Sequence, residues 1–325
     1  KGTALSVAKE LDWEVNEASV LTGEEMQQLN DEELENALAH VRIFARVTPE
    51  DKLRVTHILQ KQKHIVAMTG DGVNDAPSLK AANIGIAVGS GSDVTKSVAD
   101  LLLLNDSFQT IVSTIEEGKQ MLRNIKKILV YLLSNSLDEV ILIGGSIVAG
   151  LGLPLTAAQI IWVNLFTGSI PALAYAFDVE TSIENKEEPK QIFDNRVKFL
   201  TIIIGTLISL LLFVLYYVLL QLPLSQELVR TVVFACFGSY ILVIAFSFKN
   251  LSQPIYSYSI VDNKLLLYGV LLGFGLLFAT IYLPILQIVF STVALSWFWI
   301  LVVLLWMLFT LILAELAKTF CNRSL

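Results

Sequence analysis

The sequence predicts a partial α/β domain of the Rossmann type followed by an all-α bundle of six transmembrane helices. Of its 325 residues, 54% are hydrophobic and 16% are charged, which is too apolar for a soluble protein. Charges concentrate in residues 1–120, where short β-rich runs alternate with helical patterns, and apolar runs dominate from about Ile128 onward. We therefore expect a cytoplasmic domain at 1–120, a stalk with the first two spans at 121–178, and four further spans at 179–325.

The composition also excludes several classes of protein. A net charge of -7 provides no basic surface, so nucleic acid is not an expected partner. The two cysteines, Cys236 and Cys321, cannot build a disulfide framework or a thiolate zinc site. The three histidines, His40, His57 and His64, are not spaced as metal ligands.

Periodicity and turn residues define the elements of the first part. Pro49 stands at the first position of a helix, with Thr48 as its cap. A β-rich run leads into the turn Thr69-Gly70-Asp71-Gly72, and Ala76-Pro77 opens the next helix. Strand, tight turn and helix in this order form a doubly wound parallel sheet, which binds ligands at the carboxyl ends of its strands. The other expected elements are helices at Thr3–Leu11 and Gly23–Val41, strands at Arg42–Val47, Ile65–Met68, Ile84–Val88 and Leu101–Leu104, and a helix from about Ser107.

Six apolar runs in the second part approach the ~20 residues that a helix needs to cross a ~30 Å hydrocarbon core. They lie near 128–151, 156–177, 198–221, 229–248, 264–287 and 294–315. We therefore expect an integral membrane protein that has the lipid bilayer as a partner.

The basic residues predict the orientation of these spans. They gather before the first run and in alternate links, whereas the other links carry only Arg230, at a boundary. The positive-inside rule then places both ends of the chain in the cytoplasm, and we assign the plasma membrane. The basic residues concerned are Arg123, Lys126, Lys127, Lys186, Lys190, Arg196, Lys198, Lys249, Lys264, Lys318 and Arg323.

The most specific signal in the first part is the run from Thr69 to Asp75. Two carboxylates, Asp71 and Asp75, on a glycine turn after a strand suit a hard cation such as Mg²⁺, which takes oxygen ligands and shares them with a phosphate. We predict that Asp71 holds the metal, that Asn74 and Asp75 position Asp71 and the phosphate, and that Thr69 and Gly70 contact the phosphate. The alternative is an ordinary Asp-Gly turn with capping side chains.

A second motif places Lys52 in the first turns of the helix that begins at Pro49. A compact ammonium group at a strand edge can neutralise a phosphoryl oxygen. Taken alone, such a lysine is more often simply solvated, but its companion motif favours a role in the site.

Polar side chains interrupt the first two apolar runs. In the first run Asn135 and Glu139 share one helix face, with Ser136 beside them. An intramembrane carboxylate costs at least about 2.5–3.5 kcal/mol and is by default a functional-site hypothesis. Ser134 and Asp138 are further polar residues of this run. The alternatives are a pair that helps the helices to pack, or an aspartate near the membrane interface.

The second run carries Asn164 and Thr167 ahead of Pro171. Proline has no N–H, so it frees the carbonyl of Thr167, beside the flexible Gly168. Oxygens of Asn164 and Thr167 that face Glu139 would form a cage for a transported cation. A plain proline kink is the alternative.

The motifs together resemble the C-terminal part of a P-type cation-transporting ATPase of the calcium-pump-like branch. The resemblance covers nearly the whole chain, from Lys1-Gly2-Thr3-Ala4 through Phe44–Lys52 and Thr69–Pro77 to Trp162-Val163-Asn164-Leu165 and the six spans. It implies a haloacid-dehalogenase-like phosphorylation domain that uses Mg²⁺ and ATP and passes through an aspartyl-phosphate. It also implies that Asp71 binds Mg²⁺, that Lys52 contacts the phosphoryl group, and that an unbroken helix through Gly118–Lys127 links this domain to Glu139.

The sequence departs from the family pattern in three ways. The Asp-Lys-Thr-Gly-Thr motif does not occur, so this chain alone is not expected to hydrolyse ATP and needs an N-terminal half with actuator and nucleotide domains. The acidic residue expected after Thr167 is Gly168, and the polar group expected in the fourth span is Ile241. The amide expected three residues before Glu139 is Ser136, with Asn135 displaced by one. We therefore expect one cation per cycle, or a different monovalent or divalent cation, rather than two calcium ions.

Two alternative functions stay open at this point. A membrane-anchored haloacid-dehalogenase-type phosphatase would share the turn from Asp71 to Asp75, but residues 1–64 contain no Asp-x-Asp nucleophile motif. The other alternative is an inactive truncated pump fragment or non-catalytic partner. The chain opens on Lys1 without a Met or a signal peptide, which we interpret as part of a longer protein.

Overall fold

The structure is a computed structural model that describes residues 1–10, 13–179 and 191–324. It divides into two compact units, Lys1–Ile115 and Glu116–Leu325, and each is described here by itself. The first unit is α/β and the second is helical, as expected. The predicted helix at Thr3–Leu11 is α1, Gly2–Glu10, and Leu11 lies outside the described residues.

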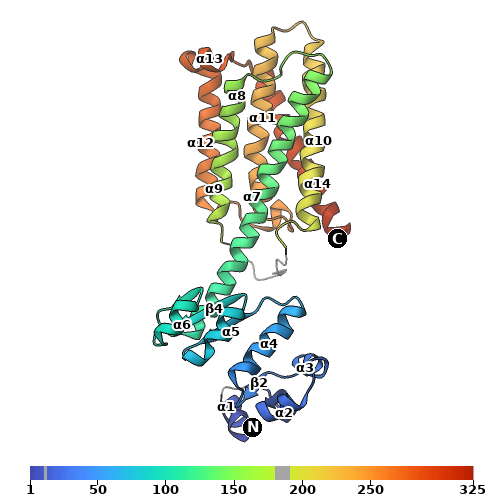
Figure 1. The fold of residues 1–325 in the computed structure, drawn as a ribbon. Coiled ribbons are helices and arrows are strands. Elements are labelled where there is room, and N and C mark those ends of the chain that lie inside the picture. Colours follow the sequence, from blue (N-terminus) through green and yellow to red (C-terminus); the bar gives the residue numbers. More distant parts are fainter. Residues whose placement is uncertain (11–12, 180–190, 325) are drawn as a thin grey trace. The chain divides into compact units, whose positions relative to one another are not determined.

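A three-stranded parallel sheet forms the centre of the first unit, with the order β3-β4-β5 (Figure 1). Its strands are β3 (Ala67–Gly70), β4 (Ile84–Val88) and β5 (Leu101–Leu103), close to the predicted bounds. The crossovers are α5 (Ala76–Ala81) and α6 (Asp93–Val98). Parallel strands joined by helices bring the residues after β3 and β4 to one edge of the sheet.

A two-stranded parallel sheet pairs β1 (Val20–Thr22) with β2 (Ile43–Ala45). The prediction of one helix over Gly23–Val41 is wrong, because the segment contains α2 (Gly23–Gln28) and α3 (Asp31–Leu38). Asn30 ends the first helix and caps the second: its side chain accepts from the Glu33 N–H at 2.9 Å, and the Glu33 carboxylate accepts from the Asn30 N–H.

The predicted helix at Pro49 is α4, Pro49–Lys61, and Thr48 caps it through a capping box with Asp51. The Thr48 hydroxyl accepts from the Asp51 N–H at 3.2 Å, and the Asp51 carboxylate accepts from the Thr48 N–H at 2.9 Å. This cap holds the first turn, which carries Lys52, against the end of β2. Buried Ile58 joins α4 to Met26 and Leu34 in a small core.

A long helix, α7 (Phe108–Val148), confirms the unbroken helix predicted through Gly118–Lys127. Its 41 residues correspond to about 60 Å at 1.5 Å per residue. The second span is composite: α8 (Ala157–Trp162), a π-helical segment η3 (Val163–Gly168) and α9 (Ser169–Ala176).

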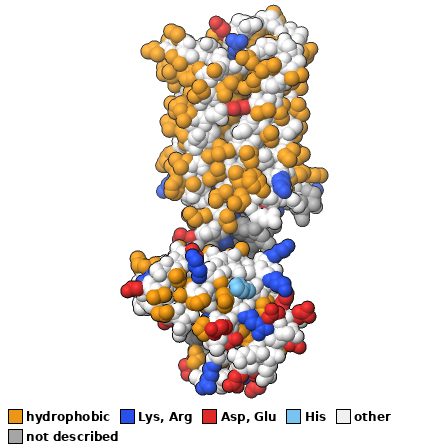
Figure 2. Space-filling view, in the orientation of Figure 1, with side chains coloured by type: hydrophobic (Ala, Val, Ile, Leu, Met, Phe, Trp, Pro, Cys, Tyr) orange, Lys and Arg blue, Asp and Glu red, His pale blue; other side chains and the backbone are white. Residues whose placement is uncertain are grey.

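The other spans are α10 (Asn195–Leu220), α11 (Gln226–Phe248), α12 (Lys264–Tyr282) and α14 (Trp297–Ser324). Within the described residues, six helices are long and apolar enough to cross a membrane. They stand side by side as a bundle with α11 at its buried centre (Figure 1). The surface of the bundle is largely hydrophobic, as a lipid-facing surface must be (Figure 2).

The predicted fifth span, 264–287, is too long. Pro284 stops α12 at Tyr282 and starts a separate short helix, α13 (Pro284–Phe290). Short 3-10 helices occur at Glu17–Ser19, Val73–Asp75 and Ile255–Ser257. Lys186 and Lys190, which contributed to the predicted orientation, lie outside the described residues.

Candidate functional site

Lys52 and Asp75 come together in the first unit although they are 23 residues apart. The Lys52 Nζ donates to Asp75 Oδ1 at 2.6 Å, and the side chains are 35% and 12% exposed. Lys52 stands on the first turns of α4 and Asp75 at the start of α5. The Ser78 hydroxyl of α5 donates to the Pro49 carbonyl of α4 at 3.3 Å, which fixes the two helix ends against each other.

Gly70 is needed where β3 ends because Asp75 folds back over it. A Cβ on Gly70 would lie 2.5 Å from the Cβ of Asp75 and 2.8 Å from Leu79 Cδ1. Any larger residue would displace Asp75, and with it the acceptor of Lys52. The glycine therefore permits a close approach of backbone and side chain.

Asp71 follows directly after β3, and its side chain is exposed. The loop after β4 holds its backbone, since the Ser92 N–H donates to the Asp71 carbonyl at 2.9 Å. Thr95, which is fully buried, donates through its hydroxyl to the Gly72 carbonyl at 2.9 Å. The two neighbouring strand ends thus meet at one edge and present the Asp71 carboxylate to solvent.

The geometry of this edge fits Mg²⁺ only when a phosphate completes the ligands. Within residues 1–10, 13–179 and 191–324, no group of three or more His, Cys, Asp or Glu side chains could hold a metal. Mg²⁺ commonly takes one or two carboxylates together with phosphate oxygens and water. The exposed Asp71 can supply one such carboxylate, while Asp75 is already bonded to Lys52. Thr69 and Gly70 end β3, and Asn74 lies in the 3-10 helix that follows two residues later.

In the membrane unit the structure brings Glu139 and Asn164 together. The Asn164 Nδ2 donates to Glu139 Oε1 at 2.7 Å and to the Ile160 carbonyl at 3.2 Å. Glu139 lies midway along the hydrophobic part of α7, and Asn164 lies in the π-helical segment η3. A rotated amide would present its oxygen beside the carboxylate, and two oxygens from two helices could then bind a cation.

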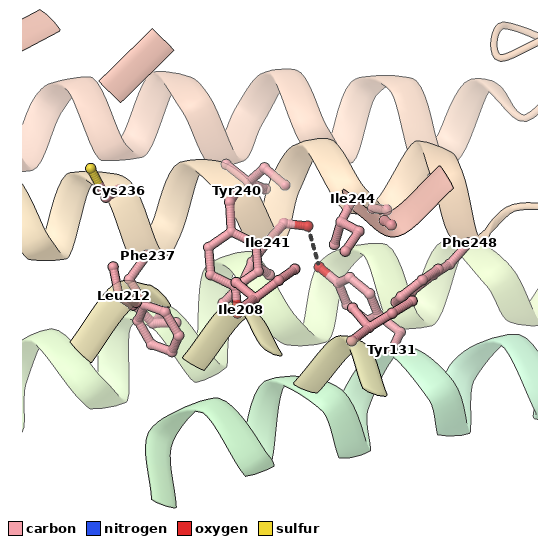
Figure 3. Packing of buried hydrophobic residues seen from close by; sticks show 14 of the residues in the cluster. Tyr131, Ile208, Leu212, Cys236, Phe237, Tyr240, Ile241, Ile244 and Phe248 are labelled. Carbon is pink, nitrogen blue, oxygen red and sulfur yellow. Dashed lines mark hydrogen bonds between the residues drawn. The ribbon is translucent and has the colours of Figure 1, made fainter. Parts of the chain in front are cut away.

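The π-helical segment changes the hydrogen bonding around Thr167. Pro171 offers no N–H to the Thr167 carbonyl, and the Tyr131 hydroxyl donates to that oxygen at 2.5 Å. Tyr131 is fully buried and also donates to the Ile241 carbonyl at 3.3 Å, as Figure 3 shows. The Thr167 hydroxyl donates to the Val163 carbonyl at 2.7 Å. Both Thr167 oxygens are thus occupied by bonds to groups other than Glu139.

The remaining predicted cation ligands are not bonded to Glu139 in the part of the chain that the structure describes. The Ser136 hydroxyl is exposed and donates to its own helix, at the Leu132 carbonyl. Asn135 is 8% exposed and therefore buried in the bundle. The structure joins only Glu139 and Asn164 directly among the five residues predicted for the transported cation.

A buried ion pair lies near the other end of the bundle. The Lys127 Nζ donates to Asp178 Oδ2 at 2.7 Å, with side chains 5% and 3% exposed. The second oxygen, Asp178 Oδ1, accepts from Asn263 Nδ2 at 3.0 Å, and the Asp178 carbonyl accepts from Asn124 Nδ2 at 2.8 Å. Three segments far apart in sequence are tied together at one carboxylate.

A more exposed pair, Lys126 and Asp194, lies just outside the third span. The Lys126 Nζ donates to Asp194 Oδ2 at 2.5 Å, and Asp194 Oδ1 caps α10 by accepting from the Val197 N–H at 2.8 Å. Partial burial alone would raise the pKa of Asp194, but the hydrogen bonds from Lys126 and Val197 and the Lys126 charge lower it below its ordinary value.

Sequence reasoning did not find several of the residues that shape these sites. Ser92 caps α6 and Thr95 lies in its first turns, directly after the glycine-rich turn Gly89–Gly91, which was the available signal. Tyr131 carried no signal, because its partners Thr167 and Ile241 lie on other spans. The partner of Asp138, Ser209, lies 71 residues away.

Comparisons with known proteins identify the family. Residues 152–320 match the family described as "Cation transporting ATPase, C-terminus". The chain belongs to the cation-transporting ATPases. Residues 53–115, which include Asp71 and Asp75, match the family described as "haloacid dehalogenase-like hydrolase". The α/β unit is therefore a haloacid-dehalogenase-like partial domain joined to the C-terminal membrane region of a P-type cation-transporting ATPase.

Relatives of this cation-transporting ATPase chain include proteins named as calcium-transporting ATPases. One from Bacillus cereus is 36% identical over 316 residues, which covers 91% of this chain and 36% of the relative. One from Saccharomyces cerevisiae is 33% identical over 337 residues, which covers 100% of this chain and 35% of the relative. "Calcium-transporting ATPase type 2C member 2" of Rattus norvegicus is 34% identical over 331 residues, which covers 99% of this chain and 35% of the relative. The chain spans about a third of the length of these relatives.

Proposed function

We propose that this chain is the C-terminal portion of an ATP-driven cation pump that works through an aspartyl-phosphate. The observation that carries the proposal is the Glu139–Asn164 contact inside the membrane unit, at the π-helical break of the second span. A carboxylate and an amide at such a break offer oxygen ligands within the bilayer, where a purely structural helix needs none.

The first unit supplies the phosphate chemistry in this proposal. Asp71 would hold Mg²⁺ together with phosphate oxygens, and the bound ion would neutralise charge on the phosphoryl group. The Lys52 ammonium, whose side chain is 35% exposed, exchanges its bond with Asp75 for one with a phosphoryl oxygen. Thr69, Gly70 and Asn74 position the phosphate. The aspartate that accepts the phosphoryl group, and the actuator and nucleotide domains, come from outside these residues, so the chain alone is inactive.

The cargo in this proposal is a single cation per cycle, bound by Glu139 and Asn164 with Asn135, Ser136 and Thr167 as further oxygen donors. Several relatives are named for calcium transport, which makes Ca²⁺ the first cation to test. The protein resides in the plasma membrane with both ends of the chain in the cytoplasm. That orientation follows from the basic residues in alternate links.

Glu139→Gln in the native protein that carries this chain tests the ion site. The change keeps the size of the side chain and removes the charge, so ion-dependent phosphorylation should be lost while membrane insertion and thermal stability stay close to wild type. Glu227→Gln, in the first turn of α11, is the matched control and should leave ion dependence unchanged. Unchanged ion dependence in Glu139→Gln would contradict the assignment.

Asp71→Asn and Lys52→Ala test the phosphate edge. Removal of one preorganised charge that stabilises a transition state lowers turnover by about 10²–10³-fold. Lys80→Ala, an exposed lysine at the end of α5, should have no effect on turnover. ATPase activity is measured against Ca²⁺, Na⁺, K⁺ and Mn²⁺ with Mg²⁺ present. Phosphatase activity that no transported cation stimulates would instead favour the anchored phosphatase.

A further inference from the structure

A second intramembrane carboxylate, Asp138, faces away from Asn164 and toward α10. Its Oδ1 accepts from the Ser209 hydroxyl at 2.5 Å, and the side chain is 1% exposed. Asp138 and Ser209 are 71 positions apart in sequence. A Cβ on Gly205 would lie 3.1 Å from the Ser134 carbonyl, and Ser134 and Gly205 have the same offset. The equal offsets show that α7 and α10 run parallel to each other. We call the surface where they meet, formed by Ser134, Asp138, Thr201, Gly205 and Ser209, the α7–α10 seam.

Asp138 has no cationic partner within the described residues. Its hydrogen-bond partner is the neutral Ser209, whose single O–H is shared between Asp138 and the Gly205 carbonyl. Between Thr201 and Phe213, α10 carries no charged side chain. A carboxylate buried in this way is costly unless a positive charge accompanies it. Lys127, by contrast, is bonded to Asp178 and is therefore not that charge.

Two further hydroxyl groups of the seam are buried without a hydrogen bond in the described part of the chain. They are the Oγ of Ser134, 2% exposed, and the Oγ1 of Thr201, 7% exposed. Ser134 lies one helical turn before Asp138. An unsatisfied buried hydroxyl costs about 1–3 kcal/mol, so the unbonded Ser134 hydroxyl, one turn from an unpaired carboxylate, indicates a ligand. Thr201 lies further along the same seam, two turns from Ser209.

We propose that the α7–α10 seam is a second cation site, and that it takes a small monovalent cation such as Na⁺. Asp138 supplies the one negative charge, which balances one positive charge. Ser134 and Ser209 supply hydroxyl oxygens, the neutral ligands that suit a hard cation. Thr201 lies on the approach from the N-terminal ends of both helices. The close contact at Gly205 leaves no room for a large ion.

This site differs from the one proposed for the transported cation. Glu139 is bonded to Asn164 of η3, whereas Asp138 is bonded to Ser209 of α10. Loss of one carboxylate therefore separates the two sites, and failure of the pump assignment leaves this inference open to its own test.

The test measures Na⁺ binding by the native protein in lipid nanodiscs at fixed pH. Ionic strength is held constant by replacing NaCl with N-methylglucamine chloride, and both ²²Na⁺ binding and the midpoint of thermal unfolding are recorded. We expect saturable Na⁺ binding with a rise in the midpoint in wild type and in Glu139→Gln, and the loss of both in Asp138→Asn. Ser113→Ala, which alters an exposed serine of α7 whose hydroxyl bonds only within its own helix, to the Gln109 carbonyl, is the control and should bind as wild type does.

The double variant Ser134→Ala/Thr201→Ala covers the case in which Asp138→Asn does not fold. It removes two unbonded hydroxyls and keeps the carboxylate, so it should fold and bind Na⁺ more weakly. The proposal is overturned if wild type shows no saturable Na⁺ binding, or if Asp138→Asn or this double variant binds as wild type does. Retained binding in Asp138→Asn would identify Asp138 as a neutral acid that only packs α7 against α10.

Discussion

Two lysine–aspartate pairs in this chain have nearly the same length and very different surroundings. Lys52 and Asp75 meet at 2.6 Å with side chains 35% and 12% exposed. Lys127 and Asp178 meet at 2.7 Å with side chains 5% and 3% exposed. The second Asp178 oxygen is occupied by Asn263, whereas Lys52 has solvent on one side. The length of an ion pair is therefore a poor guide to its function. The exposure of its side chains and the bonding of their remaining atoms are better guides.

The difference in burial between the two pairs indicates which lysine can exchange its partner. A buried pair whose remaining atoms are bonded holds its segments together, and removing one member leaves an uncompensated charge. A pair open to solvent contributes little to stability and can release its lysine to an incoming phosphate at low cost. Lys52–Asp75 is thus suited to chemistry. Lys127–Asp178 is suited to holding together α7, the end of α9 and the start of α12.

The largest expected effect is that of Lys127→Met. This change leaves the Asp178 carboxylate buried without a cation, which should lower the free energy of unfolding by about 3–5 kcal/mol. The midpoint of thermal unfolding in detergent or nanodiscs measures it. The double variant Lys127→Met/Asp178→Leu removes both charges and should recover most of the loss, because apolar replacement of a whole pair is often neutral. A double variant less stable than the single one would contradict the comparison.

Gly70→Ala should have the next largest effect. The new methyl group would lie 2.5 Å from Asp75 Cβ, and overpacking of this kind costs about 1–3 kcal/mol. The displaced Asp75 should also lower turnover of the native protein. Gly2→Ala, where a Cβ meets nothing within 4 Å, is the control for an alanine at an unconstrained glycine. Equal stability of the two variants would show that Asp75 does not depend on the close approach.

Lys52→Met sharpens the comparison by separating stability from activity. Lys52 is more exposed than Lys127, so this change should cost less stability than Lys127→Met, while turnover should fall as it does for Lys52→Ala. Unfolding is followed thermally and turnover by phosphate release. A Lys52→Met variant as unstable as Lys127→Met would show that the Lys52–Asp75 pair is structural.

Local signals in the sequence predicted much of the fold. The bounds of β4 match the predicted strand, and α4 begins at Pro49 with Thr48 as its cap, because both depend on neighbours in the chain. Two wrong predictions could have been avoided from local signals. The Asn30–Glu33 capping box marks the break between α2 and α3, and Pro284 marks the end of α12. In each case a long periodic pattern had outweighed a capping or proline signal.

The parts of the site that sequence reasoning could not supply depend on contacts between distant segments. The approach of Asn164 to Glu139 was predicted, because both were assigned to one cation site. Lys52 and Asp75 were assigned to one phosphate site, but the bond between them was not predicted. The Tyr131 hydroxyl on the Thr167 carbonyl follows from no motif, because a tyrosine in an apolar run is compatible with either packing or hydrogen bonding. The prediction that the Thr167 carbonyl is freed for a cation did not anticipate this donor.

The smallest expected effect concerns the pair Lys126–Asp194, which is about as exposed as Lys52–Asp75, with side chains 14% and 35% exposed. Asp194→Asn keeps the cap on α10, because asparagine is an equally good N-cap residue, and removes only the charge. At pH 7 the change should lower the free energy of unfolding by less than about 1 kcal/mol.

The pH dependence tests the same pair. The folded protein lowers the pKa of Asp194 from its ordinary value of 3.8, so the stabilisation by the Asp194 charge is present above that value. As pH falls through the lowered pKa, wild type loses this contribution and the variant does not. Thermal unfolding of both proteins between pH 7 and pH 3 should therefore show a constant difference that shrinks only at the acidic end, and a difference that grows as pH falls would contradict the assigned direction of the pKa.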